Sequence, residues 1–233
     1  MSVIPGTGTR AARRRLANVR RDLQRYFELD SRTGNPTALE KLAIVLKSPG
    51  LHAVVVYRFT SWLHRALGCG PLRIVPKIAY FVLDTVVIVL WGIHIDKDAR
   101  IGPGLYIGHF SGVLIGPVTM GSDCNISHGV TIGRRAGGER SVPTLGDRVW
   151  VGTGSVLFGG IHVGDGTTIG PLTVVGRNLP SRVLAMGNPM RVLRREYDNS
   201  ADIYGRNRCL AAEAPPAAQD GPAKPDPAPP ADQ

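Results

Sequence analysis

A six-residue period of aliphatic residues runs through the middle of the sequence and limits the possible folds more than any other feature. Glycine follows five of the six residues in its clearest part, which are Leu145, Val151, Leu157, Val163, Ile169 and Val175. An α-helix repeats every 3.6 residues and a plain strand every two, so neither explains this spacing. A period of six is typical of a parallel β-helix, in which three short sides close a coil of roughly 18 residues.

The period continues upstream, with one displacement and one interruption. Two earlier series also have a spacing of six, the second displaced by one residue: Ile95, Ile101, Ile107 and Val113, then Leu114, Met120, Ile126 and Ile132. We therefore expect an extra residue near Val113–Leu114, held as a bulge at a corner. Between Ile132 and Leu145 the period fails, and residues 133–143 are polar, basic and rich in glycine. A loop projecting from a regular scaffold is expected there, and such loops commonly carry function.

The composition divides the chain into four parts. Residues 1–36 are basic and expected to be partly disordered, residues 37–92 form an α-helical domain, residues 93–194 form the β-helix, and residues 195–233 form a disordered Ala/Pro-rich tail. The chain carries a net charge of +10, and much of the excess lies in the first part. No aromatic residues are interleaved with these arginines, so we expect a solvated segment and no nucleic-acid partner.

The helical part contains one unusually apolar segment. Ser48 followed by Pro49 predicts a helix start. Further on, Ile78–Ile93 is strongly apolar, but it is shorter than the roughly 20 residues that span a membrane, and it carries Asp84. Two interpretations remain open for this segment. A helix buried in an oligomer is favoured, and the alternative is a helix on a membrane surface, assisted by the cations Arg65, Arg73 and Lys77.

The cysteine content bears on the compartment. The chain has three cysteines, at positions 69, 124 and 209, without the paired spacing of a disulfide framework or a zinc cluster. We expect Cys124 to pack and not to react. A reducing, cytoplasmic setting is therefore expected, with peripheral contact at the inner membrane face as the alternative that follows from the apolar segment.

Two histidines are the first candidates for chemistry. His109 follows the inward residue Ile107 by two positions, and His128 follows Ile126 by two. Since these positions lie one coil apart, the two side chains are expected on adjacent coils of one face, roughly 5 Å from each other. Without a functional role, both would simply cover the outside of the prism. Their position beside a basic, glycine-rich loop favours a functional role.

Several segments resemble one family of enzymes. Ile107-Gly-His109-Phe-Ser-Gly-Val-Leu-Ile-Gly116 is similar to the Asp-His-x-x-Gly-Val-Val-Ile-Gly segment of serine acetyltransferases. Leu145–Ser155 resembles their second repeat block, and Gly187-Asn-Pro-Met-Arg191 resembles the Gly-Asn-Pro-Ala-Arg that closes many hexapeptide acetyltransferases. The resemblance covers about residues 38–194. Enzymes of polysaccharide biosynthesis share the scaffold and often the form found here as His128-Gly-Val-Thr-Ile-Gly133.

The resemblance implies a left-handed parallel β-helix after a small α-helical domain, assembled as a homotrimer or a multiple of it. It implies acetyl-CoA as co-substrate, bound between neighbouring prisms, and no metal. His109 matches the catalytic histidine, which would accept the proton of an acceptor hydroxyl as that hydroxyl attacks the thioester. The residues expected to bind the cofactor are Gly133, Arg134, Gly152, Thr153, Gly154, Pro171 and Arg191.

The departures from the family pattern concern the acceptor. The aspartate that orients the catalytic histidine in the family is replaced by His94, and Asp96 follows two residues later. Either His94 or Asp96 is therefore expected to orient His109. Gly108 replaces an acidic residue, and after the loop the family's Arg-His-Pro is replaced by Arg140-Ser141-Val-Pro143. Contacts with the acceptor are expected from His128, Arg140 and Ser141.

These departures weigh against an amino acid as acceptor. The favoured interpretation is an acetyl-CoA-dependent O-acetyltransferase acting on a saccharide in polysaccharide biosynthesis, and the alternative is a serine O-acetyltransferase of cysteine biosynthesis. A protein without acetyltransferase activity is the third. Hexapeptide carbonic anhydrases use three histidines, usually including a His-x₄-His pair, and neither His94 nor His162 forms that spacing with His109 or His128.

One partner is not expected. Serine acetyltransferases that dock onto the next enzyme of cysteine synthesis end in isoleucine, whose side chain and carboxylate enter that enzyme's active site. This sequence ends in Pro-Pro-Ala-Asp-Gln233. We therefore expect no cysteine-synthase complex.

Overall fold

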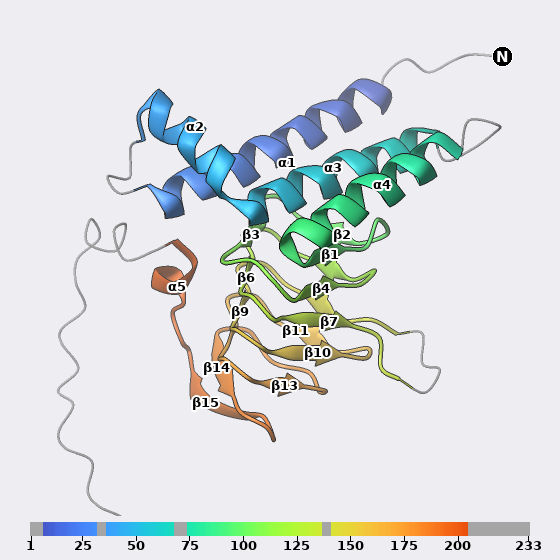
Figure 1. Ribbon diagram of the computed structural model, residues 1–233. Helices are drawn as coiled ribbons and strands as arrows, with labels where there is room; N and C mark the ends of the chain where they lie inside the picture. The colour runs from blue at the N-terminus through green and yellow to red at the C-terminus, as the bar shows by residue number, and fades with distance from the viewer. Residues whose placement is uncertain (1–6, 32–35, 68–73, 137–140, 205–233) are drawn as a thin grey trace, which may run out of the picture.

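The computed structural model describes residues 7–31, 36–67, 74–136 and 141–204, with side chains from residue 17 onward. Four helices form a layer at one end of a triangular prism of short strands, and a fifth helix lies beside the prism (Figure 1). This architecture confirms the predicted parallel β-helix preceded by helices. The helices are α1 (Thr7–Asp30), α2 (Ala38–Lys47), α3 (Pro49–Leu67), α4 (Ile74–Trp91) and α5 (Ser200–Tyr204).

The prism consists of three sheets, and successive strands along the chain join the three sheets in turn up to β13. Sheet A has the order β1-β4-β7-β10-β13, sheet B β2-β5-β8-β11, and sheet C β3-β6-β9-β12-β14-β15. All pairings are parallel except that of β14 with β15. The strands are β1 (Ile93–Ile95), β2 (Arg100–Ile101), β3 (Tyr106–Ile107), β4 (Val113–Ile115), β5 (Thr119–Met120), β6 (Asn125–Ile126), β7 (Thr131–Gly133), β8 (Thr144–Leu145), β9 (Trp150–Val151), β10 (Val156–Phe158), β11 (His162–Val163), β12 (Thr168–Ile169), β13 (Val174–Val175), β14 (Val183–Met186) and β15 (Arg191–Arg195).

The six-residue period fills the interior of the prism. The inward column of sheet A consists of the buried residues Ile95, Ile115, Ile132, Leu157 and Val175, which pair from strand to strand. Equivalent columns line sheets B and C. Burying a side chain of this size stabilises a fold by about 1.5 to 3 kcal/mol before the entropic cost of ordering it. The columns are therefore the main source of stability and leave no room for a ligand inside.

The expected displacement lies earlier than predicted, but its net size is the single residue expected, because a step of only five residues from Ile115 to Met120 follows it. Ile115 points inward and Leu114 is exposed, so the assignment of Leu114 to the inward series was wrong. The chain uses eight residues between the inward positions Ile107 and Ile115. The excess lies in the turn before β4, where His109 and Ser111 have φ of 60° and 96°. Such left-handed backbone is uncommon outside glycine and marks an enlarged corner.

Helix α1 closes the open end of the prism. The carboxylate of Asp22 accepts hydrogen bonds from the backbone N–H groups of Gly104 and Leu105 at 2.7 and 3.0 Å, and from the guanidinium of Arg58. The hydroxyl of Tyr26 accepts from the N–H of Ile107 at 2.9 Å. These bonds satisfy edge groups that a coil without a neighbour would leave unpaired.

The expectation of a solvated basic segment was wrong at Arg25, and the expectation of a disordered tail was wrong for residues 196–204. Residues 7–30 form a helix, and Arg25 of the basic run is fully buried, where its guanidinium donates to the carbonyl of Ile203 at 3.0 Å. Burial lowers the pKa of this guanidinium. At the other end, residues 196–204 do not belong to a disordered tail, because α5 packs against α1 through Ile203. Residues 205–233 lie outside the described part of the chain.

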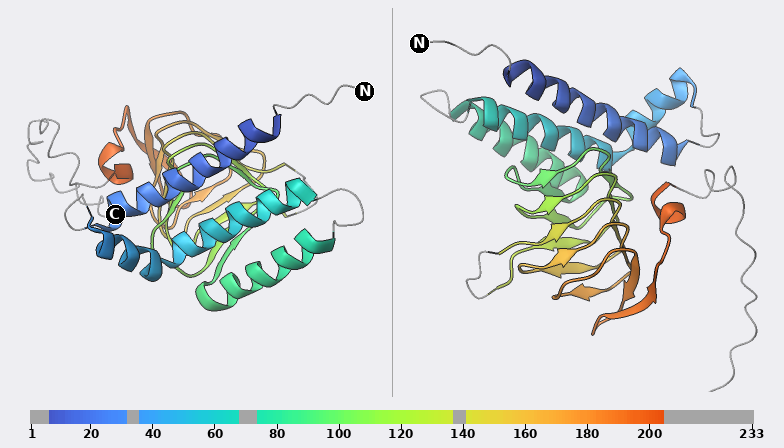
Figure 2. Two further views of the ribbon diagram at one scale, coloured as in Figure 1. Left: turned by 90° about the horizontal axis from the view of Figure 1, so that it is seen from above. Right: turned by 180° about the vertical axis from the view of Figure 1, so that it is seen from behind.

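The helical layer is only partly covered. Seen along the prism axis, α1, α3 and α4 run side by side across its end (Figure 2). Helix α3 begins at Pro49, as predicted. By length and composition, α4 could cross a membrane, and among the described residues the bent pair of α2 and α3 passes the same test if it is taken as one span. The fully buried residues of α4 are Pro76 and Val87 alone.

Candidate active site

The two histidines meet at the corner between sheets C and A. His109 follows β3 and His128 follows β6, and these strands pair through Ile107 and Ile126. The imidazole rings lie 5.7 Å apart between centroids, at 81° to each other. The predicted stacking of the two histidines on adjacent coils is therefore confirmed.

The two rings differ in their surroundings. His109 is exposed, so its imidazole can exchange protons with a bound molecule. His128 is half-buried, and its Nδ1 atom is buried without a hydrogen-bond partner among the described residues. An unpaired buried nitrogen costs free energy that a bound polar group would recover. This corner therefore combines an accessible base with a nitrogen that is ready to bind a ligand.

Three glycines continue this corner down the prism. Gly112, Gly129 and Gly154 have φ near +69°, +69° and +68°, a conformation that disfavours other residues. A Cβ on Gly129 would lie 3.4 Å from the Cα of Gly154, so the coils approach closely here. The carbonyl of His128 accepts a hydrogen bond from the N–H of Gly154 at 3.0 Å. The candidate cofactor residues Thr153 and Gly154 therefore lie on the coil directly next to His128.

The next coil brings Pro171 to the same corner, because the N–H of Leu172 donates to the carbonyl of Thr153 at 2.8 Å. Gly152 differs from its neighbours. It is buried, and a Cβ there would lie 2.7 Å from the backbone nitrogen of Pro171. Gly152 was expected to bind the cofactor, but its buried position offers no outer edge, and glycine is required there by the close spacing of the coils.

The remaining candidates lie at another corner, where sheet A ends. Gly133 closes β7, and a Cβ on it would meet no atom within 4 Å, so this edge is open. Arg134 follows it in the exposed loop, and Ser141 lies just before β8 in sheet B. Arg140 lies outside the described residues. Within one prism, the width of sheet A separates these residues from His109 and His128.

His94 has a partner that the sequence analysis missed. Its Nδ1 atom lies 2.9 Å from a carboxylate oxygen of Asp84 in α4. The hydrogen bond to Asp84 raises the pKa of His94. The one carboxylate of a largely apolar helix needs such a partner when it is buried, and this is the signal that could have identified the contact.

Asp96 has a different role. Its carboxylate accepts a hydrogen bond from the N–H of Asp98 at 2.8 Å and so stabilises the turn after β1. Among the described residues, no hydrogen bond joins His94 or Asp96 to His109. The orientation of His109 by either residue therefore stays a prediction.

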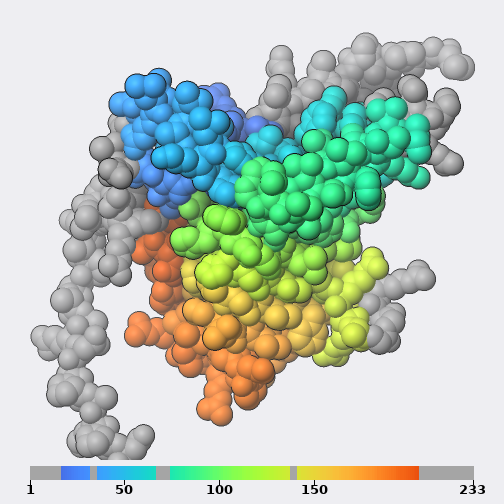
Figure 3. All heavy atoms as spheres, viewed as in Figure 1, coloured from blue at the N-terminus to red at the C-terminus, as the bar shows by residue number. Residues whose placement is uncertain are grey.

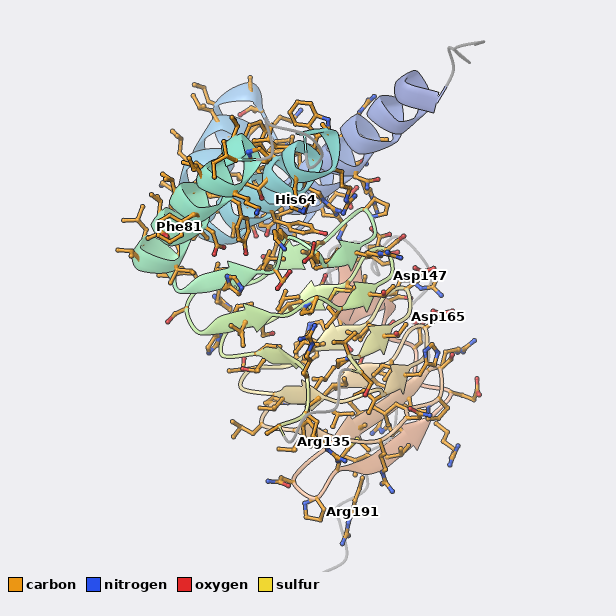
Figure 4. All side chains as sticks on the ribbon, turned by 90° about the vertical axis from the view of Figure 1, so that its right-hand side faces the viewer. His64, Phe81, Arg135, Asp147, Asp165 and Arg191 are labelled. Atoms are coloured by element: carbon orange, nitrogen blue, oxygen red, sulfur yellow. The ribbon has the colours of Figure 1, made fainter. Side chains whose placement is uncertain are left out.

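A basic hollow lies farther along the prism from the helices. Arg135, Phe158, Arg177 and Asn178 line a cavity of about 340 Å³, and the guanidinium of Arg135 lies 5.2 Å from the ring centre of Phe158. Arg191 is exposed at the start of β15, and Figure 4 shows it at the end far from the helices, with Arg135 nearer to them. Guanidinium groups suit phosphates, so Arg134, Arg135, Arg177 and Arg191 are candidates for binding a phosphorylated cofactor.

Two other kinds of chemistry find no support in this part of the chain. Among the described residues, no group of three or more His, Cys, Asp or Glu side chains is placed to hold a metal ion. Burial raises the pKa of the Cys124 thiol to about 12, which keeps it protonated and unreactive. The prediction that Cys124 packs is confirmed by its complete burial.

Comparison with known proteins places the chain in a family. No family model matches the sequence. However, the serine acetyltransferase of Helicobacter pylori (strain 26695) is 38% identical over 165 residues, which cover 70% of this chain and 91% of that protein.

Solved structures agree with this match. Brucella abortus serine acetyltransferase in complex with coenzyme A superposes with a TM-score of 0.66 at 26% identity, over 80% of this chain and 70% of that one. Neisseria gonorrhoeae serine acetyltransferase in complex with serine gives 0.62 at 29% identity, over 76% and 68%. The chain therefore belongs to the serine acetyltransferase family, the acetyl-CoA-dependent O-acetyltransferases built on hexapeptide repeats.

Proposed function

We propose that this protein is a serine O-acetyltransferase, which transfers the acetyl group of acetyl-CoA to the hydroxyl of serine. The observation that carries the proposal is the 38% identity to a serine acetyltransferase over nearly the whole length of that relative. The saccharide acceptor favoured by the sequence analysis gives way to its alternative, because the relatives reported above are all named for serine. Gly108 and Ser141, which replace residues of the family pattern, change the surroundings of the acceptor but leave His109 and His128 in place at the corner between sheets C and A.

The exposed imidazole of His109 is the proposed general base. It accepts the serine hydroxyl proton as the oxygen attacks the thioester carbonyl, and a tetrahedral intermediate forms. The intermediate collapses with cleavage of the C–S bond, and the proton on His109 passes to the sulfur of the departing coenzyme A. His128 is proposed to hold the acceptor, because its buried Nδ1 atom has no partner among the described residues.

The cofactor is proposed to lie between two prisms. Thr153, Gly154 and Pro171 line the histidine corner, whereas Gly133 and Arg134 lie beyond sheet A at another corner. One molecule of acetyl-CoA could contact both groups of residues if a second subunit placed its Gly133 and Arg134 beside the Thr153, Gly154 and Pro171 of the first. Cyclic assembly of three chains provides this arrangement at three equivalent sites.

Release of coenzyme A from acetyl-CoA, measured with a thiol reagent, tests the function. Serine should support turnover at least about tenfold better, in kcat/KM, than any of a panel of mono- and oligosaccharides. Preference for a saccharide would overturn the proposed acceptor. Light scattering tests the assembly, and an active monomer would contradict the shared cofactor site.

A further inference from the structure

Helix α4 carries a broad apolar surface that no other described element covers. Figure 3 shows α4 as a continuous raised surface at the front of the helical layer, and Figure 4 shows Phe81 on its outer side. We define the outer face of α4 by its exposed large apolar side chains, which are Ile74, Val75, Ile78, Phe81, Val82, Val86, Ile88, Val89 and Leu90.

The opposite side of α4 fixes the helix to the protein. Its less exposed side chains recur at helical spacing, and the helix contacts α3 and β1. Asp84 lies on this side, where its carboxylate bonds to His94. Asp84 is the only acidic residue of α4, so the outer face carries no negative charge. The residues of the packed side are Pro76, Tyr80, Leu83, Asp84, Val87 and Trp91.

The width of the outer face helps to identify what covers it. A helix that packs against another protein element buries a stripe of roughly 100°. The exposed apolar residues of α4 extend around about half of its circumference, at 3.6 residues per turn. Lipid can surround such an arc from all sides, whereas one neighbouring helix would leave much of it in water.

Positive charge gathers at one end of this face. Lys77, in the first turn of α4, and Arg65, near the end of α3, are both exposed. Helix α1 begins at the same end of the layer (Figures 1 and 2), and its first half carries Arg10, Arg13, Arg14 and Arg15 in the sequence. An apolar face beside a basic cluster is the combination that binds anionic membrane surfaces, because insertion and electrostatic attraction add together.

We infer that the outer face of α4 docks on an anionic lipid surface, with α4 lying along the interface. The packed side holds the helix on α3 and β1 while the opposite side enters the outer part of the bilayer. This inference is independent of the acceptor, since the face contains none of the residues proposed to bind serine or acetyl-CoA.

Cosedimentation of the purified full-length protein with vesicles tests this inference. The vesicles contain phosphatidylcholine alone or phosphatidylcholine with about one third phosphatidylglycerol. The wild type should sediment with the anionic vesicles at about 0.1 M salt and much less at about 1 M, where the Debye length falls from about 10 Å to about 3 Å. Failure of the wild type to sediment with anionic vesicles at the lower salt concentration would overturn the inference.

Three variants identify the face. Ile78→Glu combined with Phe81→Glu should lower the bound-to-free ratio at least about tenfold, because charged side chains resist insertion. The matched control is Leu42→Glu combined with Leu46→Glu, which likewise replaces two exposed apolar residues, but on α2, and should bind like the wild type. Lys77→Glu combined with Arg65→Glu should weaken binding to anionic vesicles and reduce its dependence on salt.

A second copy of the chain could cover the outer face of α4 in place of lipid. Light scattering without vesicles tests this alternative. All three variants should keep the molar mass of the wild type, and their coenzyme A release should show that they are folded. A lower molar mass of the Ile78→Glu, Phe81→Glu variant would assign the face to a subunit interface and overturn the inference. Equal loss of vesicle binding in the α2 control would likewise overturn it, because binding would then not depend on α4.

Discussion

The imidazole of His128 stands edge-on to that of His109, with ring centroids 5.7 Å apart on neighbouring coils. Only His109 is exposed, whereas His128 has a buried nitrogen that lacks a partner among the described residues. A base must reach the reacting hydroxyl, and a binding residue must hold it in place. The two histidines should therefore differ in which kinetic constant their loss affects.

Replacement of the proposed base should affect the chemical step. His109→Ala should lower kcat by roughly 10² to 10⁴, because general-base catalysis contributes on that order. The dissociation constant of coenzyme A, measured by calorimetry, should change little. His162→Ala is a suitable control, since this exposed histidine lies on sheet B. Turnover of His109→Ala within a few fold of the wild type would show that the ring only covers the prism.

Replacement of the second histidine should act on substrate binding. His128→Ala should raise the KM for serine with a smaller effect on kcat, as expected where ground state and transition state are bound alike. Initial rates over a range of serine concentrations separate the two constants. If His128→Ala abolished turnover and His109→Ala did not, the two roles would be reversed.

The contact between Asp84 and His94 should make stability depend on pH. Because Asp84 raises the pKa of His94, the folded chain binds this proton more tightly than the unfolded chain. The pair therefore stabilises the fold fully below the ordinary imidazole pKa near 6.5, provided that Asp84 is ionised. This contribution disappears as the pH rises through the raised pKa of the folded state.

Asp84→Asn isolates that contribution. Both side chains are partly exposed, so the wild type should exceed the variant by about 0.5 to 1 kcal/mol near pH 6, with a smaller difference at pH 9. Urea unfolding at several pH values measures the difference, and NMR titration follows His94 directly. A difference that grows with pH would contradict the assigned sign.

The buried carboxylate that joins α1 to the first coil should be costly to remove. Asp22→Ala leaves two backbone N–H groups without their acceptor and removes the carboxylate partner of Arg58, whose guanidinium keeps only the carbonyls of Ile101 and Gly102. We expect a loss of about 3 to 5 kcal/mol in the free energy of unfolding, as for other broken buried ion pairs. Glu196→Ala, which breaks an exposed pair with Arg182, should cost less than about 1 kcal/mol. Similar losses in both variants would show that Asp22 has no special role.

Substitutions at two glycines should distinguish a residue that the fold requires from one that borders the cofactor. Gly152→Ala should destabilise the protein by about 1 to 3 kcal/mol, since its Cβ would meet the backbone of the next coil. Gly133→Ala should leave stability within about 0.5 kcal/mol, because the space there is open. If Gly133 borders the cofactor, its substitution should instead raise the KM for acetyl-CoA. Thermal unfolding and initial rates distinguish the two effects.

The prism could be predicted from the sequence because the pattern that produces it is local in the chain. The six-residue period identifies each inward aliphatic residue without knowledge of the residues that it contacts in space. The period failed at Leu114, where the residues before β4 adopt left-handed backbone and shift the inward position to Ile115. No residue type requires that shift, so only the stacked coils reveal it.

The helical layer was harder to predict because its contacts join distant parts of the chain. Arg25 belongs to a basic run that has the composition of a solvated segment, yet it is buried against Ile203. Asp84 reaches His94 only because α4 packs beside β1. Of the site, the stacking of His109 and His128 followed from the period, whereas the division of the candidates between two corners depends on which strands the turns connect.

The hydrogen bonds of Asp22 and Tyr26 at the first coil bear on a question that any periodic fold raises, namely what sets its length. A six-residue repeat contains no signal for how many turns to build, and each exposed edge is a template for one more. Helix α1, together with α3 and α4, occupies that template on one side, and β15, which runs antiparallel along β14, ends sheet C on the other. Growth by addition of strands is thereby confined to a single molecule. A chain deprived of α1 would leave the N–H groups of Gly104, Leu105 and Ile107 without acceptors, and the edge strands of other chains could then pair with this side of the first coil.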